Sequence, residues 1–317
     1  MMPVMAKRSG TGAWDHWLRH ALAGKCKSLI PFAGFLRDVR SRTREYSSTL
    51  DRGDWALEEG LLQVEWLKHH RAVEGATVLE VGSGWEPIIP LLFVAAGAKR
   101  VYLTDQRRLA TPGSARWAIQ TMVRHRAEIT ERLQISGADF NRAVSGDPMA
   151  SGLDAYFDGL GLRYLAPCDC RHLDLPDGSV DIVTSRAVLE HIPADVIAAI
   201  LRELHRILGP GGLACHFIDP SDHWEHVDKS ISKINFLQHS DFVHGLIHSP
   251  NNYQNRLRHP EYVRMMKDAG FAVVREEREV DAASLMALNA SLKLASRFEQ
   301  FVPEDLATTN TYLLVRK

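Results

Sequence analysis

Two alternating patterns of apolar and polar residues run along most of this chain, and together they predict an α/β fold. Short apolar runs, rich in β-branched residues, are typical of buried strands. Such runs stand at 78–81, 100–104, 162–166, 180–183, 213–218, 271–275 and 311–315. Apolar residues recur at helical spacing over 56–70, 88–96, 116–133, 193–208 and 260–269. Strands that alternate with helices in this way form a mostly parallel sheet with helices on both faces.

The first junction between a strand and a helix carries a glycine-rich turn. Val78 to Val81 is followed by Gly82-Ser83-Gly84, and the helical pattern begins after Pro87. Glycine is needed where the backbone takes a positive φ or approaches a ligand closely. The next strand ends in Asp105, about 20 residues further on, where a carboxylate can accept hydrogen bonds from both hydroxyls of a ribose. These features predict a site for a nucleoside-bearing cofactor, and Glu86, where a third glycine would be expected, argues against a pyrophosphate.

Four motifs in this order resemble class I S-adenosylmethionine (SAM)-dependent methyltransferases of the type 11-like group, and in particular bacterial methyltransferases of small molecules or polysaccharides. They are Glu80-x-Gly82-x-Gly84, Asp169-Cys170, Leu175 to Val183, and Arg206 to Gly212. The resemblance covers roughly residues 56–317. It implies a Rossmann-like sheet of seven strands, closed by an antiparallel hairpin of the last two, and SAM as the cofactor.

The resemblance also implies which residues bind SAM. They are Glu80, Gly82, Ser83, Gly84, Asp105, Gln106, Asp169, Cys170, Ser185 and Arg186. Glu80 would orient the amino group of the cofactor, and Asp105 would accept from the ribose. Asp169 would accept from the adenine amine, and the backbone N–H of Cys170 would contact the adenine ring. A backbone carbonyl near residues 185–186 would meet the amino acid end.

Composition and charge narrow the class of protein. A content of 45% hydrophobic and 24% charged residues is ordinary for a water-soluble globular chain. The formal net charge of -1 gives no electrostatic case for nucleic acid as a partner. The four cysteines form no CxxC pair, which favours reduced thiols in a cytoplasmic protein. No apolar run is long enough for a membrane-spanning helix, and the first residues lack the apolar core of a signal peptide.

Three segments are expected to extend the methyltransferase domain of residues 56–317. Residues 1–55 are predicted to form an N-terminal helical arm in which basic residues outnumber acids and Trp14 and Trp17 fall at helical spacing. This arm is interpreted as a lid over the cofactor site or, alternatively, as a segment that lies on a membrane surface. Insertions at about 107–161 and 219–259 are predicted to form a cap, with residues 135–161 as a looped excursion.

The segment after the fifth strand carries the candidate catalytic residues. Methylation of a hydroxyl requires removal of its proton, most often by histidine. His223 is the favoured base, with Asp219 or Asp222 orienting its ring, and His191 is the alternative. The same segment could hold Mg²⁺ through Asp219, Asp222 and His223 or His226, but the spacing fits no specific metal motif, so no metal site is predicted.

The sequence therefore predicts a SAM-dependent methyltransferase that acts on a hydroxyl of a small or glycan-like polar acceptor. The dense side-chain donors of Asn251 to His259 suit an acceptor with many hydroxyl or phosphate groups. A membrane-surface enzyme that methylates a lipid or a quinone is the second hypothesis, and a non-catalytic SAM-binding protein is the third. Peripheral contact with a membrane would be made through residues 1–50, and no motif indicates the oligomeric state.

Overall fold

The computed structural model describes residues 18, 50–247, 253–290 and 292–317. Most of the predicted N-terminal arm therefore lies outside the described residues. The first described helix, α3 (Leu50–Lys68), runs through the boundary predicted at residue 55. Its residues from Ala56 onward contribute to the main apolar core.

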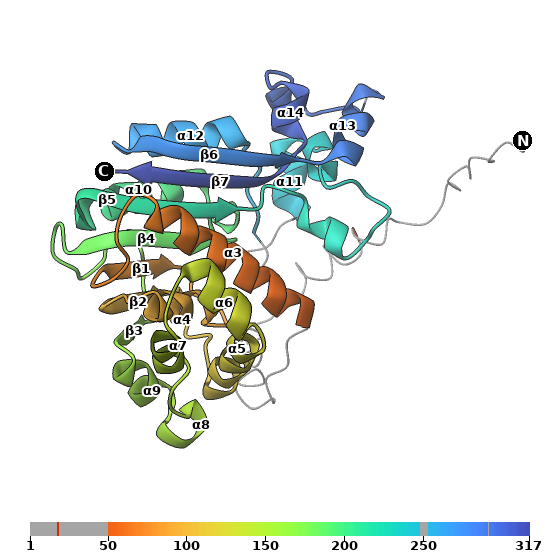
Figure 1. The fold of residues 1–317 in the computed structure, drawn as a ribbon. Coiled ribbons are helices and arrows are strands. Elements are labelled where there is room, and N and C mark those ends of the chain that lie inside the picture. The colour runs from red at the N-terminus through yellow and green to blue at the C-terminus, as the bar shows by residue number, and fades with distance from the viewer. Residues whose placement is uncertain (1–17, 19–49, 248–252, 291) are drawn as a thin grey trace, which may run out of the picture.

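Seven strands form a single sheet in the order β3-β2-β1-β4-β5-β7-β6 (Figure 1). They are β1 (Thr77–Val81), β2 (Arg100–Thr104), β3 (Leu162–Leu165), β4 (Val180–Arg186), β5 (Leu208–Ile218), β6 (Ala272–Val280) and β7 (Thr308–Arg316). The first five strands are parallel, and β7 pairs antiparallel with both β5 and β6. The predicted Rossmann-like, mostly parallel sheet is confirmed.

Helices cover both faces of this sheet, because successive residues of a buried strand point to opposite sides. In β5, Phe217 belongs to the apolar cluster beneath α3 and α4, whereas Ile218 belongs to the cluster beneath α10. The helices around the first cluster are α4 (Ile88–Ala95), α5 (Pro112–Arg124) and α6 (Arg126–Leu133), and those around the second are α10 (Ala194–Ile207) and α12 (His259–Asp268).

The strand order reverses between β1 and β4. From β1 the chain moves outward to β2 and β3, and then returns to β4 on the other side of β1. Ligands of open α/β sheets bind outside the carboxyl ends of the strands at such a reversal. The turns that follow β1, β2, β4 and β5 are therefore the place to look for a site.

The segment between β2 and β3 differs from the prediction. Residues 116–133 form two helices, α5 and α6, that meet at His125, and the break allows Arg132 of α6 to bind Glu65 of α3 at 2.8 Å. The looped excursion predicted for 135–161 is wrong. It folds as α7 (Gly137–Ala143), α8 (Pro148–Ser151) and α9 (Leu153–Gly159), which pack against α4, α5 and β3.

Smaller differences concern the C-terminal part. Strand β5 begins at Leu208, five residues before the predicted strand, and its register with β4 shifts between Val180 and Ile182. Strands β6 and β7 do pair antiparallel, but they are not joined by a tight turn. Helices α13 (Ala282–Asn289) and α14 (Pro303–Leu306) lie between them. Residues near these helices, including Phe298 and Leu306, share a small apolar core with Phe236.

We predict that Phe157→Ala lowers the free energy of unfolding by about 3–5 kcal/mol, as expected for removal of a buried aromatic ring. Phe157 is 1% exposed and belongs to the main core. Chemical denaturation would measure the change. The control is Met149→Ala in the neighbouring α8, where the side chain is 54% exposed and little change is expected. A loss below about 1 kcal/mol for Phe157→Ala would mean that α9 belongs to a cap and not to the core.

Candidate functional site

The glycine turn after β1 is tied to the end of β2. Gly82 and Gly84 have φ of 71° and 62°, which side-chain-bearing residues rarely adopt. The Ser83 N–H donates to the Thr104 carbonyl at 2.9 Å, and the Gly84 N–H donates to Oδ2 of Asp105 at 3.1 Å. The two elements predicted to bind the cofactor are therefore brought together.

The two glycines serve different purposes. A Cβ on Gly84 would meet no atom within 4 Å, so this residue faces open space that a ligand can enter. A Cβ on Gly82 would come within 2.4 Å of the Val188 side chain. Gly82 is thus required by packing between the β1 and β4 turns, which the sequence interpretation did not include.

Asp105 is placed to bind the hydroxyls of a ribose. Its Oδ1 accepts from the Arg107 N–H at 3.0 Å and its Oδ2 from the Gly84 N–H. A carboxylate has about four acceptor positions, so two remain for a ligand. Its own carbonyl accepts from the Cys168 N–H at 2.8 Å, which brings the loop after β3 beside it. Gln106 follows Asp105 directly, at the edge of the same turn.

Glu80 is a buried acid without a hydrogen-bond partner on Oε2 among the described residues. Its side chain lies in β1 and is only 4% exposed. Burial raises its pKa to about 8, although Arg186 acts in the opposite direction. An unsatisfied buried carboxyl group beside an open turn fits the amino group of SAM, because a cation there would restore the ionised form.

The loop after β3 carries Asp169 and Cys170, the two residues predicted to contact adenine. Cys170 is buried, and its Sγ donates to Thr104 Oγ1 at 3.2 Å. Asp169 is exposed, and both of its carboxylate oxygens accept from the Arg171 guanidinium at 2.7–3.0 Å. These hydrogen bonds lower the pKa of Asp169 to about 2. An adenine amine would have to share this carboxylate with Arg171.

Ser185 and Arg186 at the end of β4 are held by α3. The Ser185 carbonyl accepts from Gln63 Nε2 at 2.8 Å, and its hydroxyl lies 2.7 Å from Nδ1 of His216. That carbonyl is therefore already engaged by the protein, and Ser185 has no exposed surface. Arg186 donates from Nε to Glu59, and its guanidinium lies 4.3 Å from the centre of the Trp55 ring.

Three imidazoles converge beyond the ends of β4 and β5. The rings of His191 and His223 are 5.0 Å apart, and those of His223 and His226 are 5.5 Å apart. His191 belongs to the short helix η1 (Leu189–His191), and the other two to η2 (His223–His226). Because β4 and β5 are neighbouring parallel strands, their trailing segments meet at one edge of the sheet.

Asp219 lies beside His223, the residue whose ring it is predicted to orient. Its Oδ2 lies 3.2 Å from Nε2 of His223. Its Oδ1 accepts from the Ser221 N–H at 2.9 Å and from the Ser221 hydroxyl at 2.5 Å. Burial works to raise the pKa of Asp219, but the neighbouring His223 imidazole and the hydrogen bonds from Ser221 outweigh it and the pKa is lowered. Asp219 is therefore a carboxylate at neutral pH.

Asp222 has a structural task. It is 1% exposed, and its two oxygens accept from the backbone N–H groups of Trp224 and Phe236, both at 2.9 Å. Burial raises its pKa to about 6 against these hydrogen bonds. Asp222 thus fixes the loop between residues 222 and 236, and it does not orient the His223 ring.

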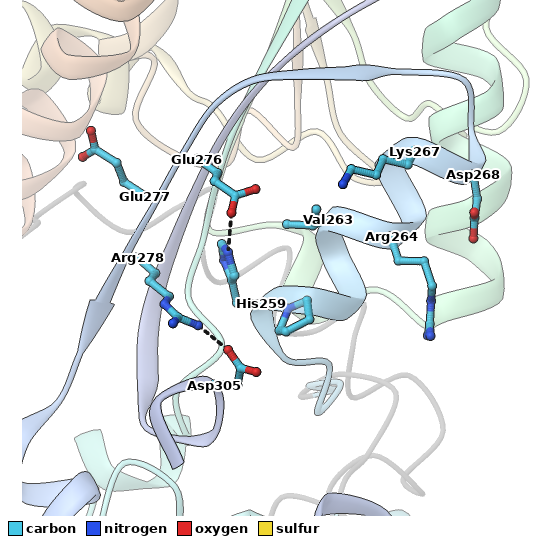
Figure 2. Close-up of a pocket in the computed structure, with 10 residues that line it drawn as sticks. His259, Val263, Arg264, Lys267, Asp268, Glu276, Glu277, Arg278 and Asp305 are labelled. Carbon is cyan, nitrogen blue, oxygen red and sulfur yellow. Dashed lines mark hydrogen bonds and ion pairs between the residues drawn. The ribbon is translucent and has the colours of Figure 1, made fainter. Parts of the chain in front are cut away.

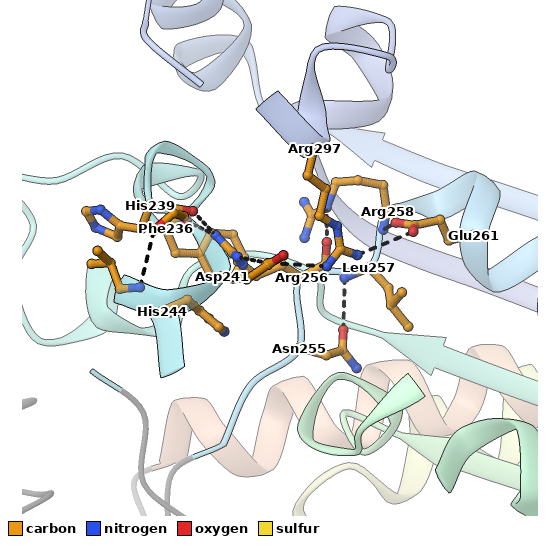
Figure 3. A network of polar contacts seen from close by, with 12 residues as sticks. Phe236, His239, Asp241, His244, Asn255, Arg256, Leu257, Arg258, Glu261 and Arg297 are labelled. Carbon is orange, nitrogen blue, oxygen red and sulfur yellow. Dashed lines mark hydrogen bonds and ion pairs between the residues drawn. The ribbon is translucent and has the colours of Figure 1, made fainter. Parts of the chain in front are cut away.

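The polar stretch before α12 is largely buried, contrary to its interpretation as an acceptor-binding surface. Figure 3 shows the polar contacts of its side chains. Asn255 donates to the carbonyls of Leu189 and Ile192 at 2.7 and 2.8 Å. Arg256 binds the carbonyl of Phe236 and Asp241. Arg258, fully buried, donates to the Pro220 carbonyl at 2.6 Å. These donors hold the loops of the site together. Residues 251 and 252 lie outside the described part of the chain.

Two functional candidates were missed by the sequence analysis. Gln254 accepts from the His223 N–H at 3.2 Å and donates to the Ser221 carbonyl, so it positions the His223 loop. Glu190 is fully buried, and neither of its carboxylate oxygens has a hydrogen-bond partner within the described ranges. An acid between Leu189 and His191 in an otherwise apolar run was the available signal for Glu190.

A separate cavity of about 630 Å³ lies between α12 and β6 (Figure 2). Its lining mixes charges of both signs, with His259 beside Glu276 and Arg278 paired to Asp305. Strand β6 is at the edge of the sheet, and β7, β5 and β4 separate it from the glycine turn of β1. This cavity is therefore not the cofactor site.

One family model and several solved structures are similar to this chain. A family model described as a methyltransferase domain matches residues 138–216. This range runs from α7 to β5 and includes Asp169, Ser185 and His191, but it excludes the glycine turn and Asp105. No curated protein matches the chain.

Solved structures with a similar fold include several methyltransferases. A SAM-dependent methyltransferase from Mesorhizobium loti is 15% identical, with 85% of this chain and 100% of that chain covered and a TM-score of 0.41. The 1,6-didemethyltoxoflavin-N1-methyltransferase of Burkholderia thailandensis is 15% identical, with 98% and 93% covered and a TM-score of 0.45. The magnesium protoporphyrin IX methyltransferase of Synechocystis is 14% identical, with 94% and 99% covered and a TM-score of 0.47. Similarity at this level assigns no acceptor.

We predict that Glu80→Gln removes a pH dependence from the stability of the ligand-free protein. The pKa of Glu80 is raised from 4.5 to about 8, so the folded state retains a proton that the unfolded state releases between these values. The wild-type free energy of unfolding should therefore fall as the pH rises from 4.5 to 8, by at most about 1.4 kcal/mol per pH unit from this group. Denaturation of both proteins at pH 5 and pH 8 measures the difference. Equal pH profiles would show that Glu80 is ionised without cost.

We predict that Asp105→Ala weakens the binding of S-adenosylhomocysteine by roughly 1.5–3 kcal/mol, the scale of hydrogen bonds to a charged acceptor. Calorimetry measures the affinity. Asp154→Ala, an exposed acid of α9, is the matched control and should bind as the wild type does. Unchanged affinity in Asp105→Ala would place the ribose elsewhere.

Proposed function

We propose that the chain is a class I SAM-dependent methyltransferase that transfers the methyl group to a hydroxyl of a small or glycan-like polar acceptor. The cofactor supplies an electrophilic methyl group on a sulfonium. The observation that carries the proposal is the pairing of His223 with the Asp219 carboxylate, 3.2 Å apart, at the carboxyl end of β5. This pairing also favours catalysis over the non-catalytic hypothesis, because SAM binding alone does not require a base.

The residues of the chain would divide the work into positioning and proton removal. The open face of Gly84, the free acceptor positions of Asp105 and the unsatisfied carboxyl of Glu80 would hold SAM at the end of β1. Transfer from a sulfonium is an in-line displacement, to which orientation contributes strongly. A hydroxyl must also lose a proton, and His223 is placed to accept it.

Asp219 favours His223 as the base. A carboxylate beside one ring nitrogen stabilises the imidazolium that forms when the other nitrogen takes a proton. Gln254 fixes the backbone of the same loop, so the ring has a defined position. His191 is the alternative base, because its ring lies 5.0 Å from that of His223.

The polarity of this region supports a polar acceptor. Asp219, Ser221 and the three imidazoles surround the position beyond β5. Hydroxylated compounds can exchange hydrogen bonds with such groups, whereas a purely apolar acceptor would leave them unsatisfied.

One observation favours the membrane-surface alternative. Phe242 is 75% exposed and Val243 38% exposed on α11 (Asp241–Ile247), next to the small cluster in which Leu18 packs against Trp224 and Ile247. No helix within the described ranges is both long and apolar enough to span a bilayer. Co-sedimentation with anionic liposomes that is lost in Phe242→Ser would favour a lipid or quinone acceptor.

We predict that His223→Ala lowers turnover by roughly 10²–10⁴-fold, the usual contribution of a general base. The assay follows radiolabelled methyl transfer from SAM to a panel of sugars and phenols, with identification of the methylated atom. Affinity for S-adenosylhomocysteine should be retained, because His223 lies outside the predicted cofactor contacts. His70→Ala, an exposed histidine beyond α3, is the control.

Two results would contradict this proposal. Methylation found only on nitrogen, carbon or sulfur would exclude the hydroxyl acceptor. Full activity in His223→Ala with loss in His191→Ala would move the base to the segment after β4.

A further inference from the structure

We propose that the histidine cluster beyond β4 and β5 is a binding site for one divalent transition-metal ion, with Zn²⁺ as the reference metal. Two overlapping groups of three residues carry the donor atoms. One consists of Asp219, His223 and His226, and the other of Glu190, His191 and His223. Within each group, the donor atoms all lie within 4.8 Å of one another.

The spacing is close to that of a ligand set. Bonds of about 2.0–2.1 Å in a tetrahedral zinc site place neighbouring donor atoms about 3.3 Å apart. The 3.2 Å between Asp219 Oδ2 and His223 Nε2 already matches this edge. His226 is exposed at the end of η2, so its side chain has freedom to approach the other two donors.

Glu190 provides an independent observation. Its side chain has no exposure, and neither carboxylate oxygen has a hydrogen-bond partner in the part of the chain that the structure describes. Buried carboxylates are normally paired or bound to a cation, because an unsatisfied one is costly. A donor oxygen of Glu190 lies within 4.8 Å of the donor atoms of His191 and His223. A metal ion at His223 would therefore bring positive charge next to this carboxylate.

The surroundings of the cluster also resemble those of metal ligands. A ligating histidine usually donates its second ring nitrogen to a carbonyl or carboxylate, which fixes the nitrogen that binds the metal. Nδ1 of His191 lies 3.0 Å from the Tyr253 carbonyl, so Nε2 is left for a metal. Asp219 receives both hydrogen bonds from Ser221 on Oδ1, so Oδ2 remains directed to His223.

The donor types select the metal. Mg²⁺ prefers six oxygen ligands, whereas imidazole suits Zn²⁺ and the neighbouring transition metals. Three histidines in the cluster therefore argue against the Mg²⁺ site considered from the sequence. Three protein ligands with a fourth position open to solvent or substrate are typical of catalytic zinc sites.

The role of this metal rests on the proposed function, but its binding does not. An ion in the cluster would bind the acceptor hydroxyl and lower its pKa, and His223 would then be a ligand instead of the base. The hydroxyl proton would pass to solvent, and the resulting alkoxide or phenolate would attack the methyl group. Binding itself is measured without acceptor or cofactor.

The test is metal titration of the full chain after treatment with EDTA. Competition with a chromophoric chelator measures Zn²⁺ affinity, and Co²⁺ reports coordination through its visible absorption. We expect one Zn²⁺ per chain, a Co²⁺ spectrum of tetrahedral intensity, and at least a tenfold preference for Zn²⁺ over Mg²⁺. His226→Ala and Glu190→Gln should each weaken Zn²⁺ binding at least tenfold. Because His226 is exposed, its replacement leaves the fold intact.

The matched control is His70→Ala, which removes an exposed histidine far from the cluster and should bind Zn²⁺ as the wild type does. Zn²⁺ affinity that is equal in wild type and His226→Ala would overturn the proposal, as would loss of affinity in His70→Ala alone. If Zn²⁺ does not bind but methyl transfer to a hydroxyl still depends on His223, only the metal proposal fails. If Zn²⁺ binds and the methyl group is found on nitrogen, only the proposed function fails.

Discussion

The site depends on the electrostatic interaction between Arg186, at the end of β4, and the buried acids around it. Three buried acids, Glu59, Glu80 and Glu190, have their pKa values raised by burial, and in each case Arg186 acts against that rise. Arg186 itself is fixed by Glu59 and by the face of Trp55. One guanidinium among three carboxyl groups leaves the interior of the site short of positive charge. This imbalance favours cationic ligands, because each would let a buried carboxyl group ionise.

The excess of buried carboxyl groups over positive charges is found at two places in the site. Glu80 lies near the end of β1, where the proposed cofactor site would receive the positively charged amino group of SAM, and Glu190 lies after β4, where the histidines gather. Helix α3 connects the two positions, since it supplies Glu59 and Trp55 to Arg186 and Gln63 to the Ser185 carbonyl. Helix α3, which carries none of the four sequence motifs, therefore holds the guanidinium that influences both Glu80 and Glu190.

The sequence predicted those parts of the fold that depend on local patterns. Strand β2 was placed to the residue, and the glycine turn with Asp105 was found because Gly82 and Gly84 have no other local explanation. Residues 135–161 were misjudged, because short amphipathic helices rich in glycine, serine and aspartate look like loops until Phe140 and Phe157 are seen in the core. Their burial is a tertiary effect that local composition does not carry.

The polar stretch before α12 shows the converse error, because side chains that were predicted to be exposed are buried. Arg256 and Arg258 read as surface donors, since arginine is rarely buried. They are buried because the loops after β4 and β5 expose backbone carbonyls, such as those of Phe236 and Pro220, that need donors. Sequence reasoning assigned these side chains to a ligand when the protein itself is their partner.

The histidine cluster illustrates what topology adds to a list of candidate residues. His191 and His223 are 32 positions apart in the sequence, and nothing in their spacing suggests a pair. They meet because β4 and β5 are parallel neighbours whose carboxyl ends lie at one edge. The same geometry brings Glu190 under the cluster, so any proton or cation that binds the imidazoles also compensates a buried acid. Whether His223 is a base or a metal ligand, its role thus places a positive charge close to Glu190 and Asp219. The difference between them lies only in whether that charge is a proton on His223 or an ion that His223 holds.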